Sequence, residues 1–226
     1  MAAVRTVGPN TTVMSNRWPP FGEDCELDLI IWNTHTTSLS ELSVEQATDL
    51  LSVVFSRYED HRTRTAHVIA FLSVGVQALA SQPHLHAQVS SLPQQLSDRR
   101  VYSDEALLED FLAAQAEDTV VGESDTLVYV APSPLRAGEV RIVARTVSDV
   151  ARHLLASLSA VESVFGPLAY SVVFASSERF RVAHLLPVVY GGPGVYETVL
   201  GVHRPVMPVA HQAALLRPAY VRATVG

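Results

Sequence analysis

Residues 81–89 of the chain read SQPHLHAQV, which places two histidines and a glutamine at alternating positions. Successive side chains of an extended strand point to opposite faces, so His84, His86 and Gln88 are expected to share one face of a β-sheet. A neutral imidazole is a competent nucleophile towards phosphorus near pH 7, and a second imidazole and an amide can orient it and bind phosphate oxygens. Histidines with this spacing also occur as surface or structural residues. The stretch therefore predicts a strand and, as one of two interpretations, a phosphoryl-transfer site.

The length and composition indicate a protein with a full hydrophobic core. The chain has 226 residues, of which 48% are apolar, enough for one large α+β domain or two packed halves of about 110 residues. Its single cysteine, Cys25, rules out an intrachain disulfide and every CxxC metal site, so a metal would need histidine or carboxylate ligands. No stretch has the length and apolarity of a signal peptide or a membrane span. We therefore expect a cytoplasmic protein that does not bind a membrane.

The charged residues argue against several classes of partner and chemistry. All sixteen basic residues are arginines, so neither a Schiff-base lysine nor a Walker-type phosphate-binding lysine can occur. The formal net charge is −7, and the basic residues do not cluster beyond Arg99 and Arg100. A nucleic-acid-binding protein usually carries a basic patch. We therefore expect small-molecule ligands and no nucleic acid.

The order of predicted elements around the histidine stretch occurs twice. A capping box at Ser43–Gln46 opens the first long helix, and the remaining elements follow from hydrophobic periodicity. The first unit has strands at 25–32, 66–73 and 84–90, with a helix from 43 to about 60. A short helix at 103–116 and a strand at 126–130 follow. The second unit then has strands at 139–144, 170–175 and 180–188, with a helix at 148–165. We expect an α+β fold of two repeats, residues 1–98 and 99–226, with a mixed, mostly antiparallel sheet flanked by helices. Two unrelated α+β stretches are the alternative.

Three segments resemble the galactose-1-phosphate uridylyltransferase branch of the histidine-triad (HIT) superfamily. Residues 75–93, GVQALASQPHLHAQVSSLP, are similar to the family's active-site segment, in which a glycine, Ser-Asn-Pro and His-Pro-His-x-Gln follow in this order and spacing. Residues 35–43, HTTSLSELS, resemble its His-x-x-x-Leu-Pro-Glu-Leu/Met-Ser before a helix. Residues 15–21, SNRWPPF, are similar to its Asn-containing nucleotide-contacting stretch. The resemblance implies two HIT-like repeats, with the active site in the N-terminal one and a diverged C-terminal one.

The resemblance also implies catalytic roles for the residues of the histidine stretch. His86 would be the nucleophile that takes a nucleoside monophosphate from a nucleotide sugar, and Gln88 would hold the phosphate of the covalent intermediate, with His84 beside them. Histidine-triad hydrolases have a third histidine at the position of Gln88, so the glutamine favours transferases and phosphorylases. A neutral nitrogen attacks a phosphorus shielded by anionic oxygens more readily than a carboxylate does, which agrees with this assignment.

The family pattern further implies substrate-binding residues around this site. Ser81 would bind the phosphates, and Gly75 would let the backbone approach them. The other positions that touch the nucleotide or its supports are Asn16, Arg17, Ser73 and Gln82. Several of them depart from the family: Gln82 replaces asparagine, Leu72 and Ser73 replace a Glu-Asn pair, Leu85 replaces proline, and Arg17 replaces an acidic residue. An arginine at position 17 could meet an extra anionic group of the substrate, so the base and the sugar stay open.

Metal binding is doubtful by the same comparison. His35 and His84 occupy family positions that bind a structural zinc together with two cysteines of an N-terminal CxxC, and those cysteines are absent here. Only two of four tetrahedral ligands remain, so we do not expect a conventional zinc site, and the sequence indicates no other cofactor with certainty. His184 aligns with a histidine of a second metal site in some members, but its usual partners are not evident in the sequence. We expect it to be a core or interface histidine.

The leading hypothesis is therefore a hexose-1-phosphate uridylyltransferase-like nucleotidyltransferase. It would move a nucleoside monophosphate from a nucleotide sugar to a sugar phosphate or similar small acceptor through a nucleotidyl-histidine intermediate. One alternative is a phosphorylase or hydrolase of nucleotide sugars or dinucleoside phosphates that uses the same His86. Another is a catalytically silent nucleotide-binding relative. The resemblance also implies a homodimer.

Overall fold

The computed structural model describes residues 4–7, 10–16, 25–93, 103–132, 134, 136, 138–189 and 207–225. Arg17 and the predicted boundary between residues 98 and 99 lie outside the described residues, so both stay predictions. None of the described helices is both long and apolar enough to cross a membrane.

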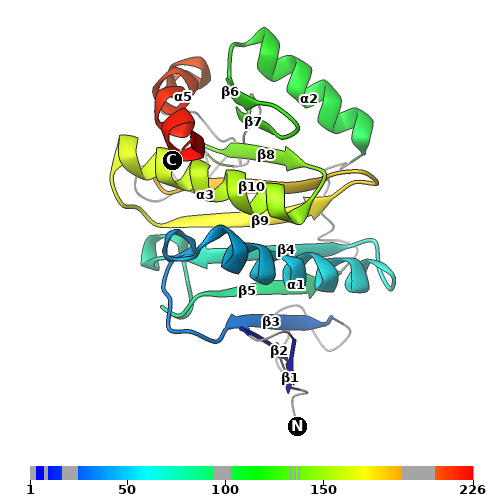
Figure 1. Cartoon of the computed structure of the whole chain (residues 1–226). Coiled ribbons are helices and arrows are strands. Elements are labelled where there is room, and N and C mark those ends of the chain that lie inside the picture. Colours follow the sequence, from blue (N-terminus) through cyan, green and yellow to red (C-terminus); the bar gives the residue numbers. More distant parts are fainter. Residues whose placement is uncertain are drawn as a thin grey trace, which may run out of the picture.

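A single large sheet forms the centre of the molecule (Figure 1). Within the described ranges it has ten strands in the order β1-β2-β3-β5-β4-β9-β10-β8-β7-β6, and each described pair of neighbours is antiparallel. The strands are β1 (Val4–Thr6), β2 (Thr11–Ser15), β3 (Leu27–Trp32), β4 (Val68–Val74), β5 (His86–Ser91), β6 (Val120–Glu123), β7 (Leu127–Val130), β8 (Val140–Ala144), β9 (Tyr170–Ser176) and β10 (Arg181–Pro187). The predicted α+β class is confirmed, and the sheet is more uniform than the mixed one expected.

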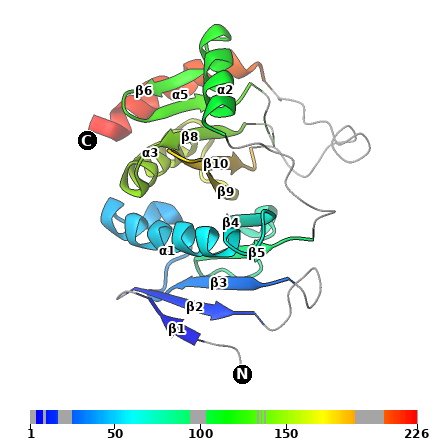
Figure 2. The same ribbon diagram turned by 90° about the vertical axis from the view of Figure 1, so that its right-hand side faces the viewer.

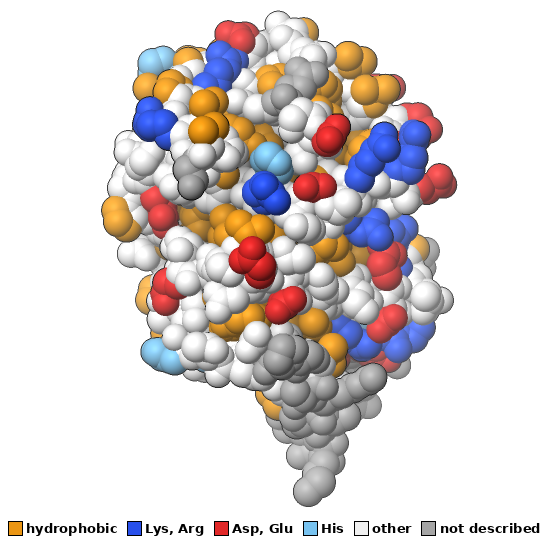
Figure 3. All heavy atoms as spheres, in the orientation of Figure 1, with side chains coloured by type: hydrophobic (Ala, Val, Ile, Leu, Met, Phe, Trp, Pro, Cys, Tyr) orange, Lys and Arg blue, Asp and Glu red, His pale blue; other side chains and the backbone are white. Residues whose placement is uncertain are grey.

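Helices cover both faces of the sheet. The helices α1 (Val44–Arg62) and α3 (Val147–Phe165) lie side by side on one face, and α5 (Val209–Val225) packs on α3 (Figures 1 and 2). The helix α2 (Asp104–Ala116) packs on the opposite face, over β7, β8 and β10. Arginine and acidic side chains are interspersed on the side that carries α1 and α3, and neither gathers in one patch there (Figure 3).

The start of α1 confirms the capping box predicted from the sequence. The backbone N–H of Gln46 donates to Ser43 Oγ at 3.2 Å, and the backbone N–H of Ser43 donates to Gln46 Oε1 at 2.9 Å. Both bonds satisfy backbone donors that the first helical turn leaves without partners. Leu50, Leu51 and Val54 of this helix are fully buried against the sheet, so the helix is fixed at its start and along its inner face.

The strand order reads symmetrically from the two edges of the sheet. The succession β3, α1, β4, β5 recurs as β8, α3, β9, β10, and the two sets meet where β4 pairs with β9, with Phe71 opposite Val173. This confirms the repeated element order expected from the sequence. Val68–Val74 of β4 can be matched in order with Tyr170–Ser176 of β9. The pairing of β4 with β5 and of β9 with β10 then makes Val182 equivalent to His86, and His184 equivalent to Gln88.

Three short strands were not predicted. β1 has three residues, β2 five and β6 four. These strands lie at or next to the two edges of the sheet, and in β6 the pairing with β7 shifts register between Val120 and Gly122. So few residues hold too little alternation to distinguish a strand from a loop.

Candidate active site

The residues of the histidine stretch lie on β5, on the sheet face opposite α1 and α3. Ala87 and Val89 point into the core beneath these helices and are fully buried, so the alternating His86 and Gln88 point to the other face, where they are half-buried. Ile31 of β3 is opposite His86, and Leu29 is opposite Gln88. The shared face predicted for His86 and Gln88 is therefore present.

His86 belongs to a row of residues that runs across neighbouring strands of the sheet. Leu72 of β4 is opposite Ala87, so Ser73 is next in line with His86. Ser73 in turn is opposite Ser171 of β9, and their hydroxyl oxygens lie 2.9 Å apart. Leu186 of β10 is opposite Ser171. We call His86, Ser73, Ser171 and Leu186 the His86 row.

The backbone carbonyl of His84 fixes the proton on the ring of His86. His86 Nδ1 lies 2.8 Å from the carbonyl oxygen of His84, and because a carbonyl oxygen can only accept, Nδ1 carries the hydrogen. In the neutral ring the lone pair is then on Nε2. His84 is held separately, since its Nε2 donates to the carbonyl oxygen of Trp32 at 2.5 Å. The arrangement orients the ring of His86, and its Nε2 then carries the lone pair that a nucleophilic role would need.

The second matching segment lies directly beside the first. The backbone N–H of Leu85 donates to the carbonyl of Thr36 at 2.7 Å, which draws the segment after His35 alongside β5. The rings of His35 and His84 are consequently 5.8 Å apart between centroids. Residues about fifty positions apart in the sequence are thus brought together.

This histidine pair does not make a conventional zinc site. A structural zinc needs four protein ligands, and in the part of the chain that the structure describes no group of three or more histidine, cysteine, aspartate or glutamate side chains is placed to hold a metal. Cys25 is buried just before β3, whereas His35 follows the other end of that strand. Nε2 of His84 is also engaged with Trp32. The described residues therefore do not offer the ligand set of a structural zinc.

The turn between β4 and β5 is shaped by a glycine. Gly75 has a φ of +85°, and a Cβ atom there would lie 2.8 Å from Cβ of Ala169, so both backbone conformation and packing require glycine. Ser81 and Gln82 follow in the same connection and are exposed. The phosphate-binding roles predicted for these three residues stay predictions.

Asn16 lies far from His86 along the strand direction. Its backbone N–H donates to the carbonyl of Leu27 at 2.7 Å, beyond the end of β2, while Thr12 is the β2 residue opposite Ile31 in line with His86. Four residues of extended chain span about 13 Å. Asn16 therefore lies out of reach of the His86 ring.

In the second half, the position that matches Gln88 holds a histidine in a buried polar network. His184, which matches Gln88, has its Nδ1 2.6 Å from Glu139 Oε1, and Arg141 Nη2 donates to the same oxygen at 2.9 Å. Arg141 also pairs with Asp110 of α2, which accepts from the hydroxyl of Tyr129 at 2.6 Å. Burial raises the pKa of the Tyr129 phenol far above its usual value, so this hydroxyl stays a donor.

This network corrects the sequence analysis at one point. His184 is a core histidine, as expected, but a glutamate partner that was not evident in the sequence is present in Glu139, which is completely buried. The nearest sequence signal is the pairing of Glu139 and Arg141 at alternating positions beside an apolar strand. Charged residues at alternating positions of a strand usually lie on the solvent-facing side of the sheet. This pattern therefore indicated an exposed Glu139, whereas the structure buries it.

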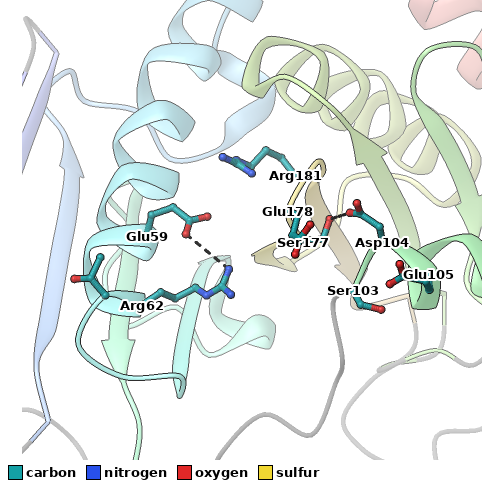
Figure 4. A pocket seen from close by; sticks show the side chains of 9 residues that line it. Glu59, Arg62, Ser103, Asp104, Glu105, Ser177, Glu178 and Arg181 are labelled. Carbon is teal, nitrogen blue, oxygen red and sulfur yellow. Dashed lines mark hydrogen bonds and ion pairs between the residues drawn. The ribbon is translucent and has the colours of Figure 1, made fainter.

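A large cavity occupies the other end of the sheet from His86. It has a volume of about 740 Å³ and is lined by the end of α1, the start of α2 and the β9–β10 turn, with Arg62, Asp104 and Arg181 among its residues (Figure 4). Arg62 lies near Glu59, and Ser177 Oγ donates to Asp104 at 2.5 Å. No residue of the predicted site lines this cavity within the described ranges, so its size does not make it the site of His86 chemistry.

Comparison with known proteins shows which solved structures share this fold. No model of a known family matches the sequence, and no curated protein is detectably similar to it. Among solved structures, an ADP-glucose phosphorylase from Arabidopsis thaliana superposes with a TM-score of 0.77 at 16% identity over 96% of this chain and 85% of that one. The chain has the fold of the uridylyltransferase-like proteins. A uridylyltransferase matches with a TM-score of 0.74 at 16% identity over 96% of this chain and 86% of its own, and a GalT-like protein from Arabidopsis thaliana with 0.73 at 16% over 96% and 88%. The resemblance drawn from residues 35–43 and 75–93 is therefore confirmed at the level of the uridylyltransferase-like fold.

Proposed function

We propose that the chain is a nucleotidyltransferase that works by double displacement on His86. In the first step Nε2 attacks the α-phosphorus of a nucleotide sugar, a P–N bond forms, and the P–O bond to the sugar phosphate breaks with its electron pair leaving on oxygen. In the second step a phosphate oxygen of the acceptor attacks the same phosphorus, and the P–N pair returns to Nε2. The reaction is that of a hexose-1-phosphate uridylyltransferase, with a sugar phosphate or similar small acceptor.

The observation that carries the proposal is the hydrogen bond from His86 Nδ1 to the carbonyl of His84. It selects the tautomer whose Nε2 has a free lone pair, and it stabilises the positive charge that the ring acquires when Nε2 bonds to phosphorus. His84 is in this view a positioning residue, through its backbone carbonyl.

The surrounding residues are assigned supporting roles in this proposal. The amide of Gln88, two residues from His86 on the same face, would hold the phosphate oxygens of the intermediate without competing as a nucleophile. Ser73 and Ser81 would donate hydroxyl hydrogen bonds to phosphates, and Gln82 an amide. Asn16 would contact the far end of the nucleotide, with Arg17 meeting an additional anionic group.

The fold comparisons support this class of chemistry and one alternative within it. The superposed proteins include a uridylyltransferase and an ADP-glucose phosphorylase. A phosphorylase would share the first step and differ in using inorganic phosphate as the acceptor, so His86 has the same role in both. A catalytically silent nucleotide binder would instead leave His86 unmodified.

The decisive experiment is intact-protein mass spectrometry after incubation with a panel of nucleotide sugars. We expect the wild type to gain the mass of one nucleoside monophosphate through a bond that is stable in alkali and labile in acid, as a phosphoramidate is. His86→Ala should gain nothing. His211→Ala removes an exposed histidine of α5 and should label like the wild type. Calorimetric binding of a donor with no adduct on the wild type would contradict double displacement and leave a binder or a non-covalent hydrolase.

A further inference from the structure

A pair of serine hydroxyls joins the two halves of the sheet one strand away from His86. Ser73 of β4 and Ser171 of β9 lie opposite each other, and their Oγ atoms are 2.9 Å apart. Leu72 and Val172, the adjacent residues in the chain, are buried in the core under α1 and α3. Both serines therefore point to the face that carries His86, and the second half of the chain contributes a polar group to the His86 row.

The surroundings of Ser171 leave its hydroxyl hydrogen one polar side chain to donate to. Across the sheet, Ser171 is opposite Ser73 on one side and Leu186 on the other. Ala169 and Val173 are the residues two positions away along the chain. None of these three apolar side chains can accept a hydrogen bond. Among these described neighbours, the Ser171 hydroxyl can therefore donate only to Ser73 Oγ.

This direction of the bond leaves the hydrogen of Ser73 available. A hydroxyl has one hydrogen and two lone pairs, so Ser73 Oγ can accept from Ser171 and still donate. The other side chain in line with Ser73 across the sheet is that of His86, since Leu72 is opposite Ala87. Adjacent strands are about 4.8 Å apart. A phosphate bonded to His86 Nε2 would thus lie beside the Ser73 hydroxyl.

We propose that Ser171 is a positioning residue, which directs the hydroxyl of Ser73 towards the phosphate held at His86. The inference rests on the proposed function and adds a residue from the second half of the chain to the same site. Ionised phosphate oxygens only accept hydrogen bonds, so Ser73 can bind them only as a donor. A hydroxyl that accepts a hydrogen bond is polarised and becomes a stronger donor. Without Ser171, no neighbouring hydroxyl would fix the direction of the Ser73 hydrogen.

The test is a double-mutant cycle on the full chain, measured by calorimetric binding of AMP and of UMP. The phosphate of either probe would occupy the place of the transferred group. We expect Ser171→Ala to weaken binding about fivefold, the value of one neutral hydrogen bond, and Ser171→Thr, which keeps the hydroxyl, to restore it. Ser73→Ala should weaken binding about thirtyfold, because its partner is charged. In the Ser73→Ala background, Ser171→Ala should have no further effect.

Ser176→Ala is the matched control, because it removes a serine hydroxyl from the same strand at the end away from His86. Ser176 contacts Glu59 and Arg62, so its loss should leave the binding of both probes unchanged. Thermal unfolding checks that each variant is folded. An equal weakening in Ser176→Ala would assign the effect to the packing of β9 and overturn the positioning role.

The outcomes separate this inference from the proposed function. A further loss from Ser171→Ala in the Ser73→Ala background would overturn the inference, because Ser171 would then act by direct contact or through the fold. Binding of neither probe to the wild type would also overturn it. If the cycle holds while His86 takes up no nucleotidyl group from any donor, the positioning role stands and double displacement fails, since the titrations involve no covalent step.

Discussion

Leu79 adopts a backbone conformation that leucine rarely takes. Its φ is +59° and its ψ +32°, at the end of the short helix η2 (Val76–Ala78). The left-handed region brings Cβ close to the following carbonyl oxygen, which costs a non-glycine residue about 1 kcal/mol or more. The side chain is exposed, so no packing in the described structure offsets that cost. Strain of this kind gathers at functional sites, and Leu79 lies in the connection that leads to His86.

Leu79→Gly should therefore stabilise the fold. We expect the free energy of unfolding to rise by up to about 1 kcal/mol, because glycine adopts this conformation without the Cβ clash. The greater freedom of glycine in the unfolded chain offsets part of this gain. Urea denaturation measures the change. Leu108→Gly is the matched control, an exposed leucine inside a helix, and should lower stability by about 1 kcal/mol. A loss of stability in Leu79→Gly would show that the leucine side chain packs on something essential.

The helix α1 is held against β3 by a buried carboxylate. Asp28 Oδ2 accepts from Arg57 Nη2 at 2.6 Å and from His61 Nε2 at 3.0 Å, and the aspartate side chain is 5% exposed. Burial by itself raises the pKa of Asp28, but the hydrogen bonds from His61 and Arg57 and their charges outweigh it and lower the pKa to about 2. The cluster thus joins a strand and a helix through one ionised group.

This carboxylate makes the stability of the fold acid-sensitive. The folded pKa of Asp28 is below its ordinary value of 3.8, so its contribution of about 2 kcal/mol is present above that value and is lost as the pH falls from about 4 to about 2. The unfolding midpoint of the wild type should therefore fall with pH across this range, and this slope should be mostly lost in Asp28→Asn. Asp125→Asn, at an exposed position, should retain it. An unchanged slope in Asp28→Asn would assign the acid sensitivity to other carboxylates.

The sequence predicted best those features that are determined by residues close together in the chain. The capping box of Ser43 and the alternation of His86 and Gln88 fixed a helix start and a strand face, because both depend on residues within four positions. Asn16 was grouped with the histidines by resemblance, and only the pairing of β2 with β3 shows that it lies at the far end of the strands. Glu139 could not be predicted as a buried partner, because its burial depends on α2 covering that face.

At the scale of the whole molecule, the two halves have the same strand order, but the second half has no histidine at the position equivalent to His86. The register matches His86 with Val182, which is fully buried under α2 among Leu107 and Phe111. We therefore expect at most one nucleotidyl group per chain, even with excess donor. Quantitative intact mass measures this stoichiometry, with His184→Gln expected to label once like the wild type if it folds. Incorporation of two groups would place a second nucleophile outside the residues assigned here.

The pairing of β4 with β9 also bears on how the chain reaches its folded state. It joins residues about a hundred positions apart, such as Phe71 and Val173, and contacts of such long sequence separation slow folding because a large loop must close first. Until the ribosome has delivered β9, the edge of β4 stays unpaired, and an uncovered strand edge is where nascent chains aggregate. The pairing on both sides of β4, the neighbour of the strand that carries His86, is thus completed only late in synthesis.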